Sequence, residues 1–361
     1  MGKLTIISLS NSIKNLVQQS QRQLYQAINT TLVETYFHVG RMIVEHEQQG
    51  HKKATYAAGT LKSLSTRLTK ALGKGFSVDN LENMRQFYIS YQQQYETYLH
   101  KQTKSETASR KLQAGKTRNV KSETLSRKSP FVLTWSHYLV LRRIEDINER
   151  KFYEIEAFNE NWSVRELQRQ YDSALYERLV LSRNKKKVKE LSTKGHVVLS
   201  PSDAVKDPYI LEFLQLQEEE AYSESDFENA IIRQLEKFLK ELGKGFLFVD
   251  RQKRIKIDDE DYKVDLVFYH RLLRCFVLID LKIGTLKHQD LGQLQMYVNY
   301  FDQEIKSEEE NKTIGIILCK NKKENIIKYT LGNNKQIFAS KYKMFFPEKQ
   351  VLNLLNNYKN I

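Results

Sequence analysis

The sequence predicts an α/β domain in the C-terminal part of the chain, preceded by a mostly α-helical domain. Apolar residues recur at helical spacing up to about residue 180, whereas beyond residue 245 they form short strand-like runs around one long helix. Prolines, which interrupt helices, number only four in 361 residues. A chain of this length suits two domains. We therefore divide it into an N-terminal domain at residues 1–184, a linker at 185–208 and a C-terminal domain at 209–361.

The N-terminal domain contains a candidate helix-turn-helix. Residues 8–50 have the apolar spacing of a helix, and a second helix is expected to end at Gly73. Ser77 can then cap a third helix that begins near Val78. This outline fits a unit that docks on DNA or on a partner protein. An ordinary helical corner fits it slightly better, because no base-reading residues stand out.

Two later segments mark breaks in the helical pattern. Residues 101–130 are basic and rich in Ser and Thr, and they hold the near-copies KSETASRK and KSETLSRK, so we expect a flexible basic insertion. Ser163 and Glu166 then have the spacing of a capping box, which predicts a helix from Val164 past Leu179. Residues 185–208 combine a charged run with turn residues, as linkers do.

The C-terminal domain has the element order of an α/β fold. DFENAIIRQLEKFLKELGKGF is predicted as one amphipathic helix that ends at Gly243. Strands are predicted at 246–257, 262–269, 275–282, 313–320 and, as a short element, 337–343, with a helix at 286–303. This alternation indicates a sheet covered by helices.

Two aspartates interrupt the apolar runs of neighbouring predicted strands. If residues 262–282 fold as an antiparallel hairpin turning at Leu272-Leu273, apolar residues pair with apolar residues throughout. In that register Asp265 lies directly opposite Asp280. Because side chains alternate along a strand, Lys282 projects from the same face as Asp280.

These three residues suit a metal site. Two adjacent carboxylates repel each other unless a cation lies between them, and Mg²⁺ or Mn²⁺ prefers such oxygen ligands. Lys282 would orient the attacking water and offset negative charge developing on a phosphate. The alternative is a buried Asp–Lys pair with the other aspartate in water, which is costly without further partners.

The motif resembles the PD-(D/E)xK superfamily of restriction-endonuclease-like nucleases. The whole chain is similar to the YhcG-type family of bacterial proteins, through TWSHYLVLRRIED, FYEIEAFNENWSVRELQRQYDSALYERL, KELGKGFLFVDRQ, DLVFYHRLLRCFVLIDLKIG and GQLQMYVNYFD. This resemblance implies a restriction-endonuclease-like fold with a central mixed sheet and a helical domain before it. It also implies a metal-dependent hydrolase that cuts phosphodiester bonds, with Mg²⁺ or Mn²⁺ as cofactor.

The resemblance assigns roles to six residues. Catalysis falls to Asp265, Asp280 and Lys282; the metal ligands are Asp265, Asp280 and Glu228; and the supporting residues are Glu228, Gln293 and Tyr297. Two positions depart from the family motif. Val264 stands where the motif has proline, and the central acid is Asp280, one methylene shorter than glutamate. Neither change removes a ligand, so the site is expected to be intact.

The charge of the chain points to a polyanionic partner. The formal net charge is +14, which favours nucleic acid, and DNA rather than RNA is the expected substrate. The alternative function is a non-catalytic protein that binds nucleic acid or assembles a complex on a nuclease-like scaffold. A homodimer or a partner from a defence or restriction system is the expected protein contact. A third interpretation gives the N-terminal domain an oligomerisation role with no part in DNA binding.

No sequence feature indicates a membrane or an oxidising compartment. The N-terminal apolar run is too short for a signal peptide, and no stretch reaches transmembrane length. Cys275 and Cys319 lie in apolar runs and read as core residues. A cytoplasmic protein without a membrane partner is therefore expected.

Overall fold

The computed structural model describes residues 6–49, 54–112, 129–181, 185–216 and 222–348. By its internal contacts the chain divides into two compact units. The first consists of Met1–Arg150 and Ala157–Leu167, and the second of Lys151–Glu156 and Gln168–Ile361. The division between the units therefore falls before the segment that the sequence marks as a linker.

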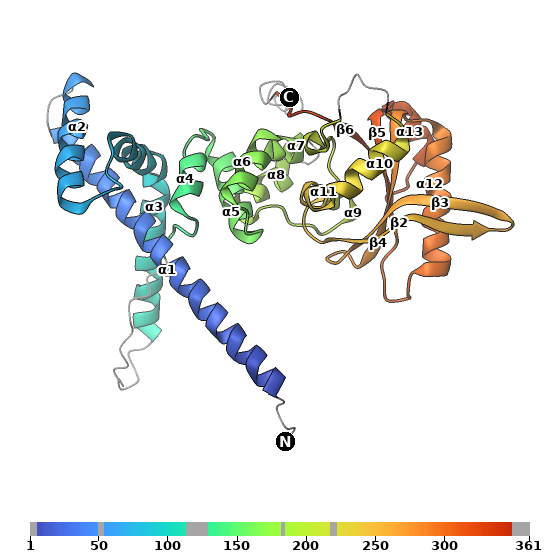
Figure 1. Ribbon diagram of the computed structural model, residues 1–361, viewed down its shortest axis with the longest axis horizontal. Helices are drawn as coiled ribbons and strands as arrows, with labels where there is room; N and C mark the ends of the chain where they lie inside the picture. The colour runs from blue at the N-terminus through green and yellow to red at the C-terminus, as the bar shows by residue number, and fades with distance from the viewer. Residues whose placement is uncertain (1–5, 50–53, 113–128, 182–184, 217–221, 349–361) are drawn as a thin grey trace. The chain divides into compact units, whose positions relative to one another are not determined.

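Two long helices, α1 (Ile6–Gln49) and α3 (Val78–Leu112), form the frame of the first unit, with α2 (Ala54–Leu72) and α4 (Trp135–Leu141) packed against them (Figure 1). The two long helices approach closely at Gly40, where a Cβ atom would overlap the carbonyl oxygen of Met84. No helix in the described part of the chain, α1 included, has an apolar stretch long enough to cross a membrane.

An aromatic core fills the space between these helices. The ring centroid of Phe37 in α1 lies 5.9 Å from that of Phe87 in α3 and 5.2 Å from that of Phe131. Tyr91 and Tyr138 pack on Phe87 at 4.9 and 5.0 Å. All five rings are buried. The residues that α1 contributes to this core therefore lie in its second half.

The predicted turn between α2 and α3 is confirmed, but the predicted end of α3 is wrong. The second helix ends at Leu72, Gly73 has a φ of +85°, and Ser77 Oγ accepts the N–H of Asn80 at 3.2 Å. The third helix then runs on through Leu112, although the sequence predicts a loop from residue 101. No glycine or proline interrupts that stretch, which explains the continued helix. Residues 113–128 of the predicted insertion lie outside the described residues.

Short helices precede the sheet. They are α5 (Ile147–Asn159), α6 (Val164–Asp172), α7 (Leu175–Leu181), α8 (Lys185–Lys194) and α9 (Pro201–Ala204), and the 3₁₀ helix η1 (Glu212–Leu214) comes just after the first strand. The single helix predicted from Val164 is divided at Ala174, whose φ is +53°. The predicted linker, residues 185–208, contains α8 and α9 and lies within the second unit.

The second unit contains a mixed six-stranded sheet with the order β1-β6-β5-β4-β3-β2. The strands are β1 (Tyr209–Ile210), β2 (Phe246–Ile257), β3 (Glu260–His270), β4 (Cys275–Thr285), β5 (Ile314–Asn321) and β6 (Ile337–Lys343). In this spatial order, β1, β6, β5 and β4 pair in parallel with their neighbours. The pairs β4–β3 and β3–β2 are antiparallel. The predicted mixed α/β sheet is confirmed.

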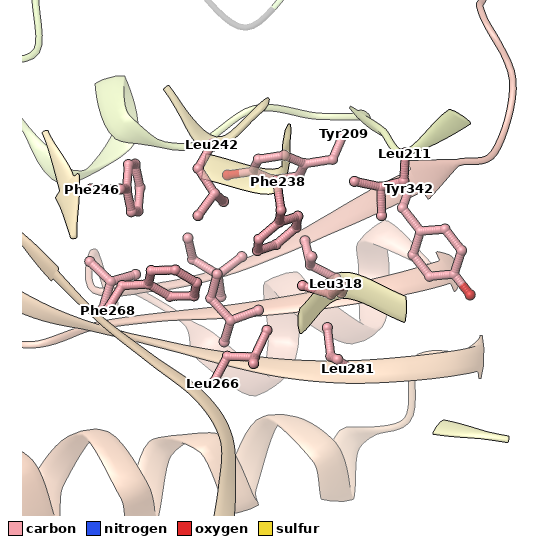
Figure 2. Packing of buried hydrophobic residues seen from close by; sticks show 14 of the residues in the cluster. Tyr209, Leu211, Phe238, Leu242, Phe246, Leu266, Phe268, Leu281, Leu318 and Tyr342 are labelled. Carbon is pink, nitrogen blue, oxygen red and sulfur yellow. The ribbon is translucent and has the colours of Figure 1, made fainter. Parts of the chain in front are cut away.

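Helices cover both faces of this sheet (Figure 1). The helices α10 (Glu224–Arg233) and α11 (Leu235–Leu242) lie on one face, and α12 (His288–Tyr300) lies on the other, next to α13 (Glu324–Leu331). Figure 2 shows Phe238 of α11 packed over Leu266, Leu281 and Leu318 of three adjacent strands. The helix predicted to run up to Gly243 is two helices, separated at Gln234.

The predicted hairpin register is confirmed for the apolar pairs from Leu266 to the turn, and it ends before the first aspartate, so the predicted pairs beyond it are absent from this ladder. The ladder between β3 and β4 runs from His270↔Cys275 to Leu266↔Ile279. Beyond Leu266, β3 pairs only with β2, and this two-stranded ribbon extends past the rest of the sheet (Figure 1). Asp265 is therefore the first residue past the fork between β3 and β4, and it is not a ladder partner of Asp280.

A buried network of charges joins the leading helices of the second unit to α11. The carboxylate of Glu241 accepts hydrogen bonds from Arg178 at 2.8 Å, from Arg169 at 3.3 Å and from the backbone N–H of Ile210 at 3.0 Å. The ammonium of Lys206 donates to the carbonyl oxygen of Glu241. The side chains of Arg178 and Glu241 are fully buried, so each charge depends on the other.

Replacing Glu241 should destabilise the protein in a pH-dependent way. The Glu241→Gln substitution leaves buried cations without a counter-charge, and we expect the free energy of unfolding to fall by about 3–5 kcal/mol. Burial alone would raise the pKa of Glu241, but Arg178, Lys206 and Arg169 outweigh it and bring the pKa from 4.5 to about 2. Wild-type stability should therefore decline as the pH falls from 4.5 toward 2, and the variant should lack this decline.

Urea denaturation across this pH range measures both effects. Glu236→Gln is the matched control, because Glu236 lies on the same helix but is exposed and pairs with Lys240 at the surface. An equal loss of stability in the two variants would contradict a structural role for the Glu241 network.

Candidate active site

The fork between β3 and β4 determines where Asp265 lies. Its Oδ2 accepts the backbone N–H of Leu281 at 2.9 Å, so the carboxylate replaces a strand partner just past the end of the ladder. This contact places Asp265 beside β4 next to Asp280. Burial raises the pKa of Asp265, and the hydrogen bond from Leu281 and the charge of Lys282 oppose that shift.

Asp280 and Lys282 form an ion pair on one face of β4. The Oδ2 atom of Asp280 lies 2.8 Å from Nζ of Lys282, which also lies 3.6 Å from a carboxylate oxygen of Glu224 in α10. Asp280 is only 4% exposed. Burial raises the pKa of Asp280 from 3.8 to about 7, against the attraction of Lys282 and helped by the nearby charge of Asp265. Burial would lower the pKa of Lys282, but Asp280 outweighs it, so the pKa of this lysine lies above its usual value.

Glu228 joins the site through a glutamine. This glutamate lies in α10 and is 5% exposed. The side-chain amide of Gln252, in β2, donates to Oε2 of Glu228 and also to Oδ1 of Asp265 at 3.3 Å. Oε1 of Glu228 lies 3.3 Å from Nε of Arg251. One amide thus links acids from two elements, and burial raises the pKa of Glu228.

Sequence reasoning missed Gln252 and its contacts. The backbone of Gln252 has a φ of +48°, a left-handed conformation that side chains other than glycine rarely adopt. The ladder between β2 and β3 shifts between Phe248 and Asp250, three residues earlier. Neither irregularity has a sequence signal here, because no glycine marks it. The sequence hint was a polar stretch, DRQKR at residues 250–254, within a strand-like run.

Gln293 and Tyr297 lie on α12, one helical turn apart. The amide of Gln293 donates to the hydroxyl of Tyr297, which is buried. Burial raises the pKa of Tyr297, and the charges of Asp280 and Asp265 raise it further. This pair therefore lies within electrostatic reach of the acids from the α12 side.

The acids fit a hard divalent cation in their chemistry. Glu228 Oε1 and Asp280 Oδ2 are buried and contact Arg251 at 3.3 Å and Lys282 at 2.8 Å, and each oxygen has a further lone pair to offer a cation. Their positive neighbours are Arg251 and Lys282, while the Gln252 amide bridges Glu228 and Asp265. Within the described ranges, no three His, Cys, Asp or Glu side chains are already gathered as metal ligands. The carboxylate oxygens of these acids suit a hard divalent cation. In this structure Arg251, Lys282 and the amide of Gln252 balance their negative charge.

Two family models match the chain. Residues 12–178 match the DUF1016 N-terminal domain, and residues 202–358 match the YhcG PDDEXK nuclease domain. The second match covers the sheet, its helices and all six predicted site residues. The C-terminal unit is thus a restriction-endonuclease-like fold.

Individual relatives agree with the family models. The chain is 38% identical over 349 residues to a protein named "Putative nuclease YhcG" from Escherichia coli (strain K12), covering 95% of this chain and 92% of that protein. Among solved structures, a repair endonuclease from Pyrococcus abyssi matches 35% of this chain and 49% of its own at 20% identity and a TM-score of 0.24. A complex titled EndoMS-dsDNA2 matches 36% of this chain and 48% of its own at 19% identity and a TM-score of 0.25. TM-scores this low do not bear on function. On the family models and the 38% identity, this chain belongs to the YhcG family of PDDEXK nuclease-domain proteins.

Proposed function

We propose that this protein is a nuclease that uses Mg²⁺ or Mn²⁺ to hydrolyse phosphodiester bonds, with DNA as its substrate. The observation that carries the proposal is the group of Asp265, Asp280 and Lys282 at the fork of the sheet. Burying such charges costs free energy, and clusters with displaced pKa values are typical of functional sites. A non-catalytic binding protein would have no need to keep them together.

Three acids would hold the metal in this proposal. Asp265, Asp280 and Glu228 supply the carboxylate oxygens, and Asp265 is oriented by the N–H of Leu281. A bound divalent ion would lower the pKa of a water ligand and polarise the scissile phosphate. Lys282 stays protonated because of its raised pKa. It therefore orients the attacking water and offsets charge on the phosphate, rather than acting as a base.

The remaining residues position these groups. Gln252 keeps the carboxylates of Glu228 and Asp265 within reach of one cation. On the α12 side, Gln293 fixes the hydroxyl of Tyr297, so that this side chain has a defined orientation near the acids or against the nucleic acid. Both contacts reduce the conformational freedom that the site must lose when substrate binds.

Nucleic acid is the substrate class that best suits the charge of the chain. Lys and Arg number 58, against 44 Asp and Glu. An excess of cations supports binding to a phosphate backbone, and the affinity should fall steeply as salt rises. The choice of DNA over RNA is decided by offering both in the same assay.

Asp280→Ala and Lys282→Ala should each reduce cleavage by at least about 100-fold, because each removes a group that acts on the reacting phosphate or its metal. The assay offers labelled DNA and RNA with Mg²⁺, Mn²⁺ or EDTA. Asp261→Ala is the matched control, since Asp261-Tyr262-Lys263 has the same Asp-x-Lys spacing and Asp261 is exposed. Cleavage that survives in Asp280→Ala would place the activity elsewhere. No cleavage by the wild type would favour the binding role.

Metal binding should stabilise the protein in a pH-dependent manner. Asp280 has a pKa of about 7, so protons compete with the metal below that pH. We expect Mg²⁺ to raise the unfolding temperature at pH about 8 and much less at pH about 5. Without metal, the folded protein holds this proton more tightly than the unfolded chain. The free energy of unfolding should therefore fall as the pH rises from about 4 to about 7, by up to about 4 kcal/mol.

Asp280→Asn should abolish both effects. Differential scanning calorimetry in EDTA and in Mg²⁺ measures them, with Asp261→Asn as the control. A Mg²⁺ shift that persists in Asp280→Asn would show that the metal binds at another site.

Gln252→Ala should weaken Mg²⁺ binding by about 10- to 100-fold, the usual effect of losing a group that orients metal ligands. The Mg²⁺ concentration that gives half of the thermal shift measures it. Arg254→Ala, on the same strand but exposed, should leave this concentration unchanged. Equal affinities in wild type and Gln252→Ala would remove Gln252 from the site.

A further inference from the structure

The first half of α1 carries an apolar stripe that no described residue covers. Eight large hydrophobic side chains in residues 6–28 are between 48% and 86% exposed, and all except Tyr25 are aliphatic and form the stripe. The stripe residues are Ile6, Leu9, Ile13, Leu16, Val17, Leu24 and Ile28. Their spacing of three, four and seven residues is that of one helix face.

The stripe is not an extension of the core of the first unit. At about 100° per residue, the seven side chains fall within an arc of about 120°. On the same scale, the buried Val33, Phe37 and Ile43 of the second half point to nearly the opposite side of the helix. The helix therefore has two apolar faces, and only the second packs on α3.

A stripe of this size implies a partner. A single helix without tertiary contacts gains little stability in water, and soluble proteins seldom leave long apolar stripes exposed. The seven side chains expose on the order of 800 Å², which is the area one partner buries in a standard protein interface.

The chemistry of the segment favours another apolar helix with few charges as its partner. Residues 6–33 contain only Lys14 and Arg22 as charged side chains, and the first acid is Glu34. Nucleic acid and membrane surfaces are bound by helices rich in cations, which this segment is not. Ser, Gln, Asn and Thr make up most of the residues that flank the stripe, so an identical helix meets it with only two cations on each copy. The same patch on two copies is self-complementary, as a two-fold interface requires.

We propose that residues 6–32 of α1 pair with the same segment of a second copy, so that the protein is a homodimer held by two crossing or coiled α1 helices. The stripe side chains of each copy fill the spaces between those of the other. This interface requires neither metal nor nucleic acid, so it stands or falls independently of the nuclease activity.

The full-length chain should have a mass of twice 42.6 kDa in sedimentation equilibrium. The Leu16→Glu and Leu24→Glu double variant should raise the dissociation constant of the dimer by about 100-fold or more, because it places charges in the apolar contact. Gln19→Glu and Gln26→Glu is the matched control, since both glutamines are exposed and lie on the opposite side of α1. Circular dichroism checks that each variant is folded.

The outcomes show whether a second copy of the chain or another part of the same chain covers the stripe. A dimer that dissociates only in the leucine variant supports the proposal. A wild-type monomer at tens of micromolar would overturn it, and loss of thermal stability on charging the stripe would then show that another part of the same chain covers it. A dimer insensitive to the leucine variant would also overturn it, because the contact would lie on another surface.

Discussion

The hydrogen bond from the backbone N–H of Leu281 to the carboxylate of Asp265 is the contact on which the rest of the site depends. The strand β3 leaves β4 at the fork, so the backbone groups of β4 lose their ladder partners there. A buried N–H must find an acceptor, and Asp265 supplies it at 2.9 Å. One side chain therefore closes the end of the ladder and fixes a carboxylate beside Asp280. The two-stranded ribbon and the acidic site are consequences of the same departure from regular pairing.

Electrostatic balance then determines the neighbours of the acids. Glu228 and Asp280 are buried and Asp265 is partly buried, and burial raises the pKa of each. Their balance comes from Lys282 beside Asp280 and from the donors of β2 beside the other two. The buried oxygens of Asp280 and Glu228 contact Lys282 and Arg251 as ion pairs, and each keeps a further lone pair. A divalent cation would remove the repulsion more completely than one ammonium and one amide, which is why metal binding is the natural interpretation.

The sequence predicted regular features and missed irregular ones. Apolar pairing predicted the register of β3 and β4 correctly, because a shift by one residue would place Leu266 and its neighbours on the wrong face. Alternation along β4 likewise predicted that Asp280 and Lys282 share a face. The left-handed backbone at Gln252 and the break at Gln234 have no such pattern, since tertiary packing imposes them on ordinary residues. Contacts such as Arg178 with Glu241 join residues 63 positions apart, a distance over which the sequence carries no periodic signal.

Uncompensated groups distinguish the functional parts of this molecule from the structural ones. The charges of Arg178 and Glu241 are fully buried, yet each has its partner within the chain, so that network needs nothing further to be stable. The acids at the fork are balanced only in part by Lys282 and Arg251, as their raised pKa values indicate, and the stripe on α1 keeps apolar surface in water. Both features therefore cost free energy that the described contacts offset incompletely. Because the first is anionic and polar while the second is apolar with few charges nearby, the two proposals give them different partners: a divalent cation with a phosphate substrate for the fork, and a second copy of the chain for α1.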